Sequence, residues 1–296
     1  MNINQFPYEV YPGLREIIFE QQKVYTPQYP KIMNVLDSER YYEEEATEIG
    51  AGLYVETADG EDYHEDTNYP GYYTKYQNKK YTNYLRISED MVKFEMYNAM
   101  GKRSRDFSNK GRVTRDILAH LIYNNGFTTN LSDGVPLFSL NHPGSPSLNA
   151  SLPNVLTTQA NLSYVALNSV LTNLAMQTDA RGVLVNMTPR KLVCHPSNRL
   201  TALECLRSYG RPDTANRADN ELKKMAEGIE LIIDPYLNSP SMWFIICDEY
   251  NVKAFEPGGF TLRTRQDPFS WDYLIFGSFY MSVGCSDFLG VYAGSQ

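Results

Sequence analysis

Apolar residues recur with two different periods along the 296-residue chain, and the two patterns occupy different parts of it. Spacings of three and four residues, typical of amphipathic helices, fall in the middle, whereas alternating or short continuous apolar runs, typical of strands, dominate the last third. The helical pattern covers residues 88–123, 158–178 and 198–208. The strand pattern covers residues 183–185, 191–194, 229–233, 243–247, 260–262 and 273–283. The sequence therefore predicts an α+β fold.

The first helical pattern is unusually long. Ser88 precedes two acidic residues, which suits a helix N-terminus. A continuous helix over residues 88–123 would span about 50 Å, which is long for a single domain. Gly101 and Gly111 weaken the pattern, and we therefore predict a break near residues 104–111.

The first part of the chain, residues 1–40, predicts an extended arm with one short helix over residues 13–23. Prolines punctuate this segment, and each one fixes φ and removes a backbone donor, so long regular structure is not expected. Tyrosines lie among the prolines. They either pack on their own domain or contact another molecule, and the sequence leaves both alternatives open.

The next segment, residues 41–87, predicts a long hairpin. One limb contains Leu53 and Val55, a turn signal lies at Asp59-Gly60, and the other limb covers residues 72–84. Between residues 41 and 66 every formal charge is negative. Because such a hairpin is too polar to carry a core of its own, we expect it to lie on a neighbouring surface.

Basic residues cluster at one place in the sequence, between residues 102 and 115, and Asp106 is the only acidic residue among them. A solvated helix face, a contact with nucleic-acid phosphates and a contact with the acidic hairpin of another subunit are the three interpretations. We hypothesise the third. The residues proposed for this contact between subunits are Glu43, Glu44, Glu45, Asp59, Glu61 and Asp62 on the hairpin and Lys102, Arg103, Arg105 and Arg112 on the basic segment.

Composition narrows the class of protein. A hydrophobic fraction of 42 %, a charged fraction of 21 % and a net charge of -8 are typical of a folded protein whose main task is not nucleic-acid binding. No apolar run approaches the roughly 20 residues of a membrane helix, so no membrane partner is expected. The four cysteines contain no C-x-x-C pair, which predicts reduced, buried thiols.

The chain offers no coherent catalytic constellation. The four histidines lack metal-ligand spacing, and there is no phosphate-binding loop and no nucleophile elbow. Cys194 and His195 are adjacent on a predicted strand, so they would point to opposite faces. The acidic cluster near Asp59 could supply calcium ligands but lacks the loop pattern of a calcium site. We expect no catalytic residue, no cofactor and no metal.

An ordered set of short motifs resembles a known family. Residues 133–143, Asp-Gly-Val-Pro-Leu-Phe-Ser-Leu-Asn-His-Pro, resemble a segment of tailed-phage major capsid proteins of the Mu-like major head subunit group. The motifs that follow in the same order are Pro189, Leu192, Val193 and Pro196, then Asn220, Gly228, Ile232, Asp234, Pro235 and Leu237, and finally Trp243 with Asp248. The similarity covers the chain from about residue 88 to its C-terminus.

The resemblance implies the Hong Kong 97-type capsid fold. It assigns an N-terminal arm to residues 1–40, an E-loop hairpin to 41–87, a peripheral domain with a long spine helix to 88–182 and an axial domain to 183–257. Residues 258–296 would return to the peripheral domain and end the chain. A hairpin without a core and an arm rich in tyrosine both fit a lattice that supplies neighbours.

The function that the resemblance implies is structural. The chain would assemble in the host cytoplasm into hexamers and pentamers of an icosahedral phage head, with the virion as its final location. Its partners would be copies of itself, portal and scaffolding proteins, a cement or decoration protein, and double-stranded DNA held by weak non-specific contact. The alternatives are an encapsulin-like protein compartment, which shares the fold, and a soluble cytoplasmic hydrolase, which belongs to another class.

Overall fold

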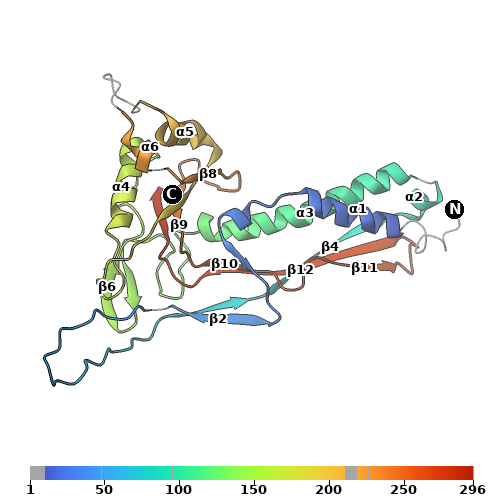
Figure 1. Cartoon of the computed structure of the whole chain (residues 1–296). Coiled ribbons are helices and arrows are strands. Elements are labelled where there is room, and N and C mark those ends of the chain that lie inside the picture. Colours follow the sequence, from blue (N-terminus) through green and yellow to red (C-terminus); the bar gives the residue numbers. More distant parts are fainter. Residues whose placement is uncertain (1–10, 48, 95, 211–218, 226, 296) are drawn as a thin grey trace.

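A computed structural model describes residues 11–47, 49–94, 96–210, 219–225 and 227–295. The molecule has a head and an elongated body, and a long loop leaves the junction between them (Figure 1). The helices are α1 (Tyr11–Val24), α2 (Glu89–Lys93), α3 (Tyr97–Asn124), α4 (Tyr164–Ala175), α5 (Arg199–Arg207) and α6 (Glu221–Met225), with short 3-10 turns at Tyr29–Lys31 and Pro196–Asn198.

The strands alternate with these helices and cluster toward the end of the chain. They are β1 (Asn34–Leu36), β2 (Tyr42–Ala46), β3 (Tyr73–Gln77), β4 (Lys79–Ile87), β5 (His142–Ser145), β6 (Leu148–Leu152), β7 (Pro189–Cys194), β8 (Glu230–Ile233), β9 (Trp243–Cys247), β10 (Val252–Phe255), β11 (Thr261–Gln266), β12 (Tyr273–Cys285) and β13 (Val291–Ser295). The mixture confirms the predicted α+β class.

The body is built around β12. Strand β4 pairs with it antiparallel along nine residue pairs, from Tyr273↔Ile87 to Met281↔Lys79. Strands β11 and β10 pair with successive parts of β12, and β1 adds in parallel to β10. Helices α1 and α3 lie together along one face of this sheet (Figure 1). Ile18 of α1, Phe107 of α3 and Ile275 of β12 share the core between them.

The predicted break in the long helix is wrong, because α3 runs without interruption over 28 residues. The break lies earlier, where α2 ends and α3 begins four residues later. Gly101, Ser104 and Ser108 are buried in α3, and the Ser108 hydroxyl donates to the Ile18 carbonyl at 2.7 Å. These small residues lie at helical spacing and let α1 approach α3 closely. Residues of low helix propensity therefore contribute to helix packing here.

The arm packs on its own chain where the structure describes it. Helix α1 confirms the short helix predicted at 13–23. The Tyr25 hydroxyl donates to Asp116 at 2.7 Å, and Tyr29 is buried in the main core. Tyr25 and Tyr29 therefore pack on their own chain, which is the first of the two alternatives left open by the sequence. Residues 1–10, with Tyr8, lie outside the described residues.

The head contains a sheet in the order β13-β9-β7-β8. Strand β9 is buried on both faces and divides two cores. Phe244 and Ile246 face the core shared with the body, where the Phe244 and Tyr123 rings stack at 4.6 Å. Trp243 and Ile245 face the second core, beneath α4 and α5. The continuous apolar run that predicts β9 therefore serves both cores.

The second predicted helix begins later than expected. Helix α4 is capped by Ser163, whose side chain accepts from Ala166 N–H, and it does not begin near residue 158. Residues before the cap run along β13 instead, where the Leu156 and Ala160 amides donate to the Ala293 and Gly294 carbonyls. Tertiary pairing thus overrides the helical pattern at this end.

The strand predictions differ from the structure in two further ways. Leu184 forms an isolated bridge with Thr178, and residues 183–185 form no strand. The hairpin β5–β6 and the strands β10 and β13 are absent from the sequence-based prediction, because their residues carry turn signals or lie in short runs. The strands predicted at 191–194, 229–233, 243–247, 260–262 and 273–283 are confirmed in essence by β7, β8, β9, β11 and β12.

The long hairpin is paired differently from the prediction. Strand β2 supplies the first limb and pairs with β3, with Tyr42 opposite Gln77 and Ala46 opposite Tyr73. Leu53 and Val55 lie in no strand. Strand β4 continues beyond β3 into the body sheet, because Tyr81 and Leu85 there can pack against the body cores. The acidic stretch has no comparable apolar face.

We predict that Ser104→Leu destabilises the unassembled subunit by about 1–3 kcal/mol, because the added side chain has no space between α3 and α1. Chemical unfolding followed by circular dichroism measures the change. Arg105→Leu, one residue along on the exposed face of α3, is the matched control and should change the free energy of unfolding by less than about 0.5 kcal/mol. Equal stability of the two variants would contradict the close packing.

Candidate assembly site

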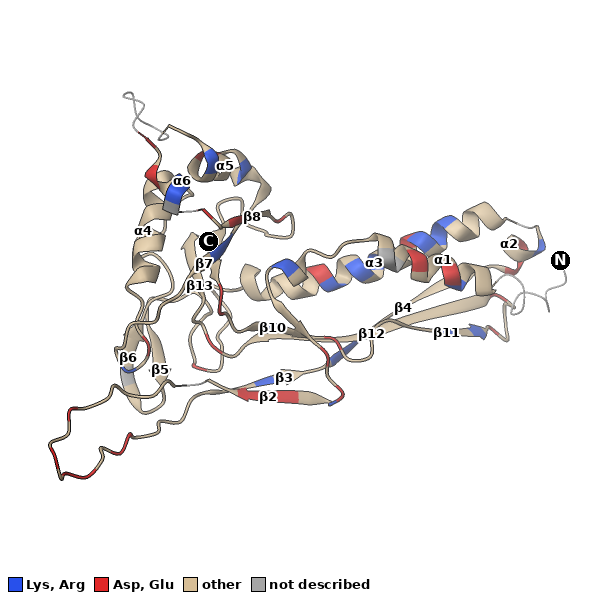
Figure 2. Ribbon diagram, viewed as in Figure 1, with Lys and Arg blue, Asp and Glu red and all other residues tan. Residues whose placement is uncertain are grey.

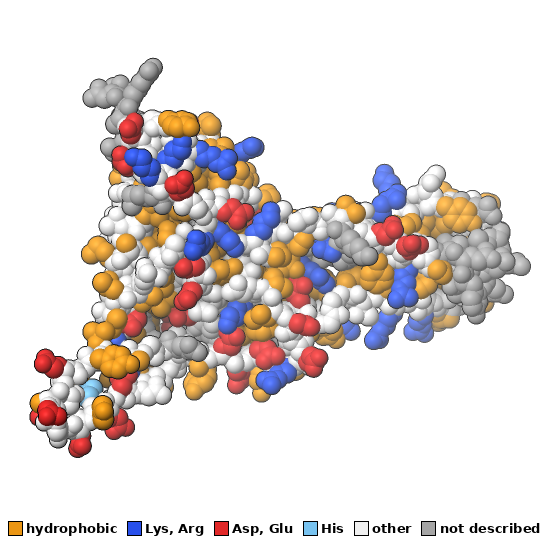
Figure 3. Space-filling model, viewed as in Figure 1, with side chains coloured by type: hydrophobic (Ala, Val, Ile, Leu, Met, Phe, Trp, Pro, Cys, Tyr) orange, Lys and Arg blue, Asp and Glu red, His pale blue; other side chains and the backbone are white. Residues whose placement is uncertain are grey.

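The acidic and basic residues proposed for a contact lie on different parts of one subunit. Figure 2 shows acidic residues along the end of the long loop and basic residues along α3 in the body. The space-filling view shows the same separation on the surface (Figure 3). The two groups therefore do not meet within one chain.

The end of the loop carries the unpaired negative charge. Asp59, Glu61 and Asp62 are exposed and make no ion pair with another described residue. We call residues 53–65 the projecting loop. Its acidic residues are thus available to a cation on another molecule.

The three glutamates of β2 already have partners. Glu43 lies 3.7 Å from Arg40, Glu44 lies 3.8 Å from Lys75, and Glu45 lies 2.7 Å from Lys253. The Lys253 pair is the most enclosed of the three and ties β2 to β10. These residues position the base of the loop, so the proposed contact between subunits rests more on the loop end.

The basic segment divides in the same way. Lys102, Arg103 and Arg105 are exposed on α3. Arg112 is half-buried and donates to the Tyr25 carbonyl at 3.3 Å, and burial lowers the pKa of its guanidinium. Arg115 is buried, pairs with Glu256 at 3.5 Å and lies over the Phe279 ring. The exposed cations of the proposed contact are therefore Lys102, Arg103 and Arg105.

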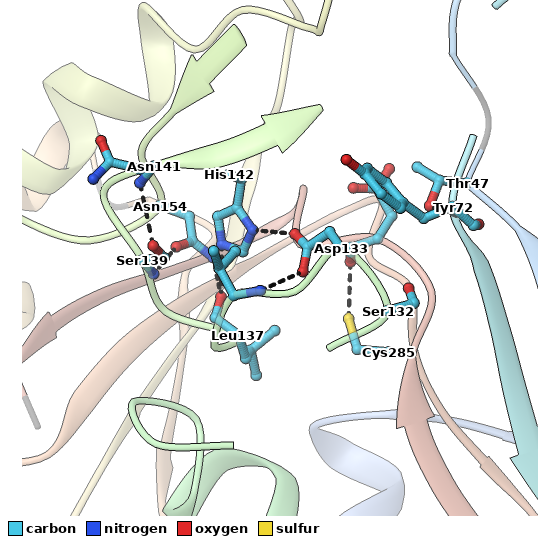
Figure 4. A network of polar contacts seen from close by, with 12 residues as sticks. Thr47, Tyr72, Ser132, Asp133, Leu137, Ser139, Asn141, His142, Asn154 and Cys285 are labelled. Carbon is cyan, nitrogen blue, oxygen red and sulfur yellow. Dashed lines mark hydrogen bonds and ion pairs between the residues drawn. The ribbon is translucent and has the colours of Figure 1, made fainter. Parts of the chain in front are cut away.

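The motif at residues 133–143 forms a polar network at the junction of loop, head and body (Figure 4). Asp133 and His142 are joined at 2.6 Å, and the other ring nitrogen of His142 lies 3.2 Å from the Leu137 carbonyl. The His142 ring stacks on Phe288 at 3.9 Å. Asn154 donates to the same Leu137 carbonyl at 2.6 Å. The motif is therefore a rigid structural element of this junction.

Both ends of the long loop are fixed beside this network. Thr47 donates from its amide to the Tyr72 carbonyl at 2.8 Å and from its hydroxyl to the Ser286 carbonyl at 2.7 Å. Ser145 donates to the Pro70 carbonyl at 2.9 Å. The loop thus leaves and re-enters the molecule at one clamped position.

A second set of contacts joins the two limbs of the long loop farther from its base. Asp66 accepts from the Gly52 amide at 2.9 Å and pairs with Arg181 at 2.6 Å. These hydrogen bonds lower the pKa of the Asp66 carboxyl. The Arg181 guanidinium also lies over the Tyr69 ring at 5.0 Å. Beyond this tie the projecting loop extends without a core of its own (Figure 1).

A buried pair joins α3 to the head. His120 and Asp234 lie 2.5 Å apart with fully buried side chains, and the other ring nitrogen of His120 contacts the Asp116 carbonyl. Asp116 in turn accepts from the amides of Gln28 and Tyr29. Burial disfavours the charged ring, but the hydrogen bond and charge of Asp234 outweigh it and raise the pKa of His120.

Most of these anchoring residues could not be predicted from the sequence. The Asp234-Pro235 motif was available as a signal, but nothing in the sequence pairs it with His120. Arg181 and Thr47 carried no signal, because their partners lie more than a hundred residues away in the chain.

The predicted buried thiols are confirmed, since all four cysteines are buried and free. Burial raises the pKa of the Cys194 thiol to about 11 and that of Cys247 to about 12. Cys194 is enclosed in the head, whereas His195 turns away and accepts from the Ser197 amide at 3.1 Å. These two side chains do not form a nucleophile and base.

No cluster of three or more metal-ligating side chains occurs among the described residues. None of the described helices is long and apolar enough to span a membrane.

Solved capsid structures share this architecture at low sequence identity. The capsid of Ralstonia phage GP4 aligns with a TM-score of 0.58 and 12 % identity, covering 88 % of this chain and 86 % of that chain. The capsid of Myoviridae phage XM1 gives 0.55 and 13 %, covering 92 % and 94 %. The virus-like particle from Pyrococcus furiosus gives 0.52 and 10 %, covering 96 % and 99 %. No curated protein matches the sequence.

These alignments define the class as a protein with the phage capsid fold, which confirms the expected Hong Kong 97-type architecture. The family model described as phage capsid protein matches residues 72–294, and the chain belongs to that family. It is a major capsid protein, a structural component of the virion. The assignment to the Mu-like group and the boundaries of the arm, E-loop, peripheral and axial domains stay predictions.

We predict that the His120–Asp234 pair makes stability depend on pH. Because the folded pKa of His120 is raised, its contribution is complete below the unfolded pKa of about 6.5 and is lost as pH rises through the folded pKa. The difference in unfolding free energy between wild type and His120→Gln should therefore be largest below about pH 6.5 and shrink as pH rises above it. Urea unfolding across this range measures it, and parallel pH curves for the two proteins would contradict the prediction.

Proposed function

We propose that this chain assembles into hexamers and pentamers of an icosahedral head that encloses double-stranded DNA, and that its role is structural and not catalytic. The observation that carries the proposal is the projecting loop, which is clamped at its base and makes no hydrogen bond or ion pair to the described residues of the head or body. A subunit with such a loop is incomplete alone. Assembly in the host cytoplasm with portal, scaffolding and cement proteins belongs to the same proposal.

Multivalency explains how such a shell holds together. Each loop buries a modest surface on a neighbour, but every subunit is held by several neighbours at once, so the effective concentration at each contact is high. The rigid clamp at Thr47 and Tyr72 fixes the direction in which the loop leaves, which reduces the entropy lost on docking.

The charges of the loop end and of α3 are proposed to set the register between subunits. Asp59, Glu61 and Asp62 are unpaired acids, and Lys102, Arg103 and Arg105 are exposed bases. Exposed ion pairs contribute only about 0–1 kcal/mol each, so their effect falls on encounter and orientation more than on strength. The net charge of -8 also suits a container in which the DNA must stay mobile.

The contents of the particle distinguish the closest alternative. An encapsulin-like compartment shares the fold and would enclose protein, whereas a phage head encloses DNA. The match to a phage capsid family favours the head. The same match gives no support to a soluble hydrolase.

We predict that the triple variant Lys102→Glu, Arg103→Glu, Arg105→Glu assembles more slowly than wild type, by about tenfold or more at low salt. Adding Asp59→Lys, Glu61→Lys and Asp62→Lys should restore part of the rate, because the charges are then exchanged. Light scattering at several ionic strengths measures it.

The control for this experiment is a triple reversal in the head, Arg190→Glu, Arg199→Glu and Arg207→Glu, at positions that are also exposed. It changes net charge equally and should assemble at close to the wild-type rate. An α3 variant that assembles like this control would overturn the proposed charge contact.

A further inference from the structure

We propose that residues 53–57 of one subunit add as a strand to the open edge of β4 in a second copy of this chain. The proposal rests on assembly by the projecting loop and names the backbone surface that receives it. Its basis is a pair of matching features: an unpaired strand edge in the body and an unpaired strand-forming segment in the loop.

The open edge belongs to β4, whose nine residues make it one of the longest strands of the molecule. One edge of β4 pairs with β12, and no described strand pairs with the other. No backbone hydrogen bond from a described loop or turn reaches residues 79–87 either. Long open edges expose rows of donors and acceptors that pair readily with another chain.

Tyr84 indicates which groups face this edge. Its amide donates to the side chain of Asn83, its own neighbour, at 2.9 Å. In a strand both backbone groups of alternate residues face the same side. Lys80, Thr82 and Arg86 therefore share the orientation of Tyr84 and offer their donors and acceptors to an incoming strand.

The matching segment is Leu-Tyr-Val-Glu-Thr at residues 53–57. Aromatic and β-branched residues in this density favour a strand. Leu53, Tyr54 and Val55 are each more than half exposed, and the segment lies in no helix or strand. Its residues have strand propensity without a strand partner in their own chain.

The segment cannot reach β4 of its own chain. Gly52, just before it, is held at Asp66 and Arg181 beside the head. The loop extends from there away from the body, whereas β4 runs toward the opposite end of the molecule (Figure 1). The pairing must therefore join two copies.

The charges and the alternating side chains of residues 53–57 complement those of β4. The β4 edge carries Lys79 and Lys80, whereas Arg86 already pairs with Asp267 and Asp272, and the segment carries Glu56 and leads directly into the acidic loop end. Alternation places Leu53 and Val55 on one face and Tyr54 and Glu56 on the other. An added strand can therefore extend both an apolar and a polar face of the sheet.

Hydrogen–deuterium exchange on the assembled particle and on the free subunit tests the inference. The amides of residues 53–57 and of the outward-facing residues of β4 should exchange at least about tenfold more slowly in the particle. The amides of residues 59–64, beyond the segment, should change less. Unchanged exchange at 53–57 and at β4 in closed particles would overturn the inference while leaving the proposed function intact. Failure to form particles at all would overturn the proposed function instead.

Proline substitution gives a second test, because proline removes the backbone donor that strand addition needs. Tyr54→Pro should reduce the yield of particles by about tenfold or more, whereas Tyr54→Ala, which keeps the amide, should reduce it less. Tyr63→Pro is the matched control, since Tyr63 is an equally exposed tyrosine of the same loop outside the segment. Equal particle yields from Tyr54→Pro and Tyr63→Pro would contradict strand addition.

Discussion

The antiparallel pairing of β4 with β12 is the interaction on which the rest of the molecule depends. It joins β4, which comes after the long loop and β3, to β12 near the end of the chain, and so closes the body sheet across nearly two hundred residues of chain. Helices α1 and α3 pack on the sheet that this pairing creates. Because β4 follows directly on β3, the same pairing also fixes where the loop leaves the body.

The role proposed for the loop in assembly depends on this fixed origin. Thr47, Tyr72 and Ser286 hold its base, and Arg181 with Asp66 holds its limbs. Residues 53–65 make no hydrogen bond or ion pair to the described residues of the head or body. A segment that exposes apolar side chains and unpaired acids at the end of a rigid support is well suited to reach a neighbour. The motif at residues 133–143 serves the same purpose, since it forms the platform for the clamp.

The parts of the fold that could be predicted from the sequence are those in which the hydrophobic pattern of the element itself matches its burial. The continuous apolar run of β9 and the alternation in β12 identify strands without help from distant residues. Gly101 and Gly111 were misleading, because α3 runs through both positions without a break and is held by its packing on α1 and the sheet. The hairpin limb at Leu53 was misleading in the opposite sense, since its strand propensity has no partner within one subunit. The partners of Glu45 and Arg112 could not be predicted, because they depend on how remote elements pack.

The most direct test of this account is cryo-electron microscopy of particles formed when the chain is expressed with the scaffolding protein of its phage. The account predicts closed shells of hexamers and pentamers in which residues 53–65 of every subunit lie on the body of a neighbour, beside β4 and α3. Monomers alone, or shells in which this loop contacts no other subunit, would contradict it.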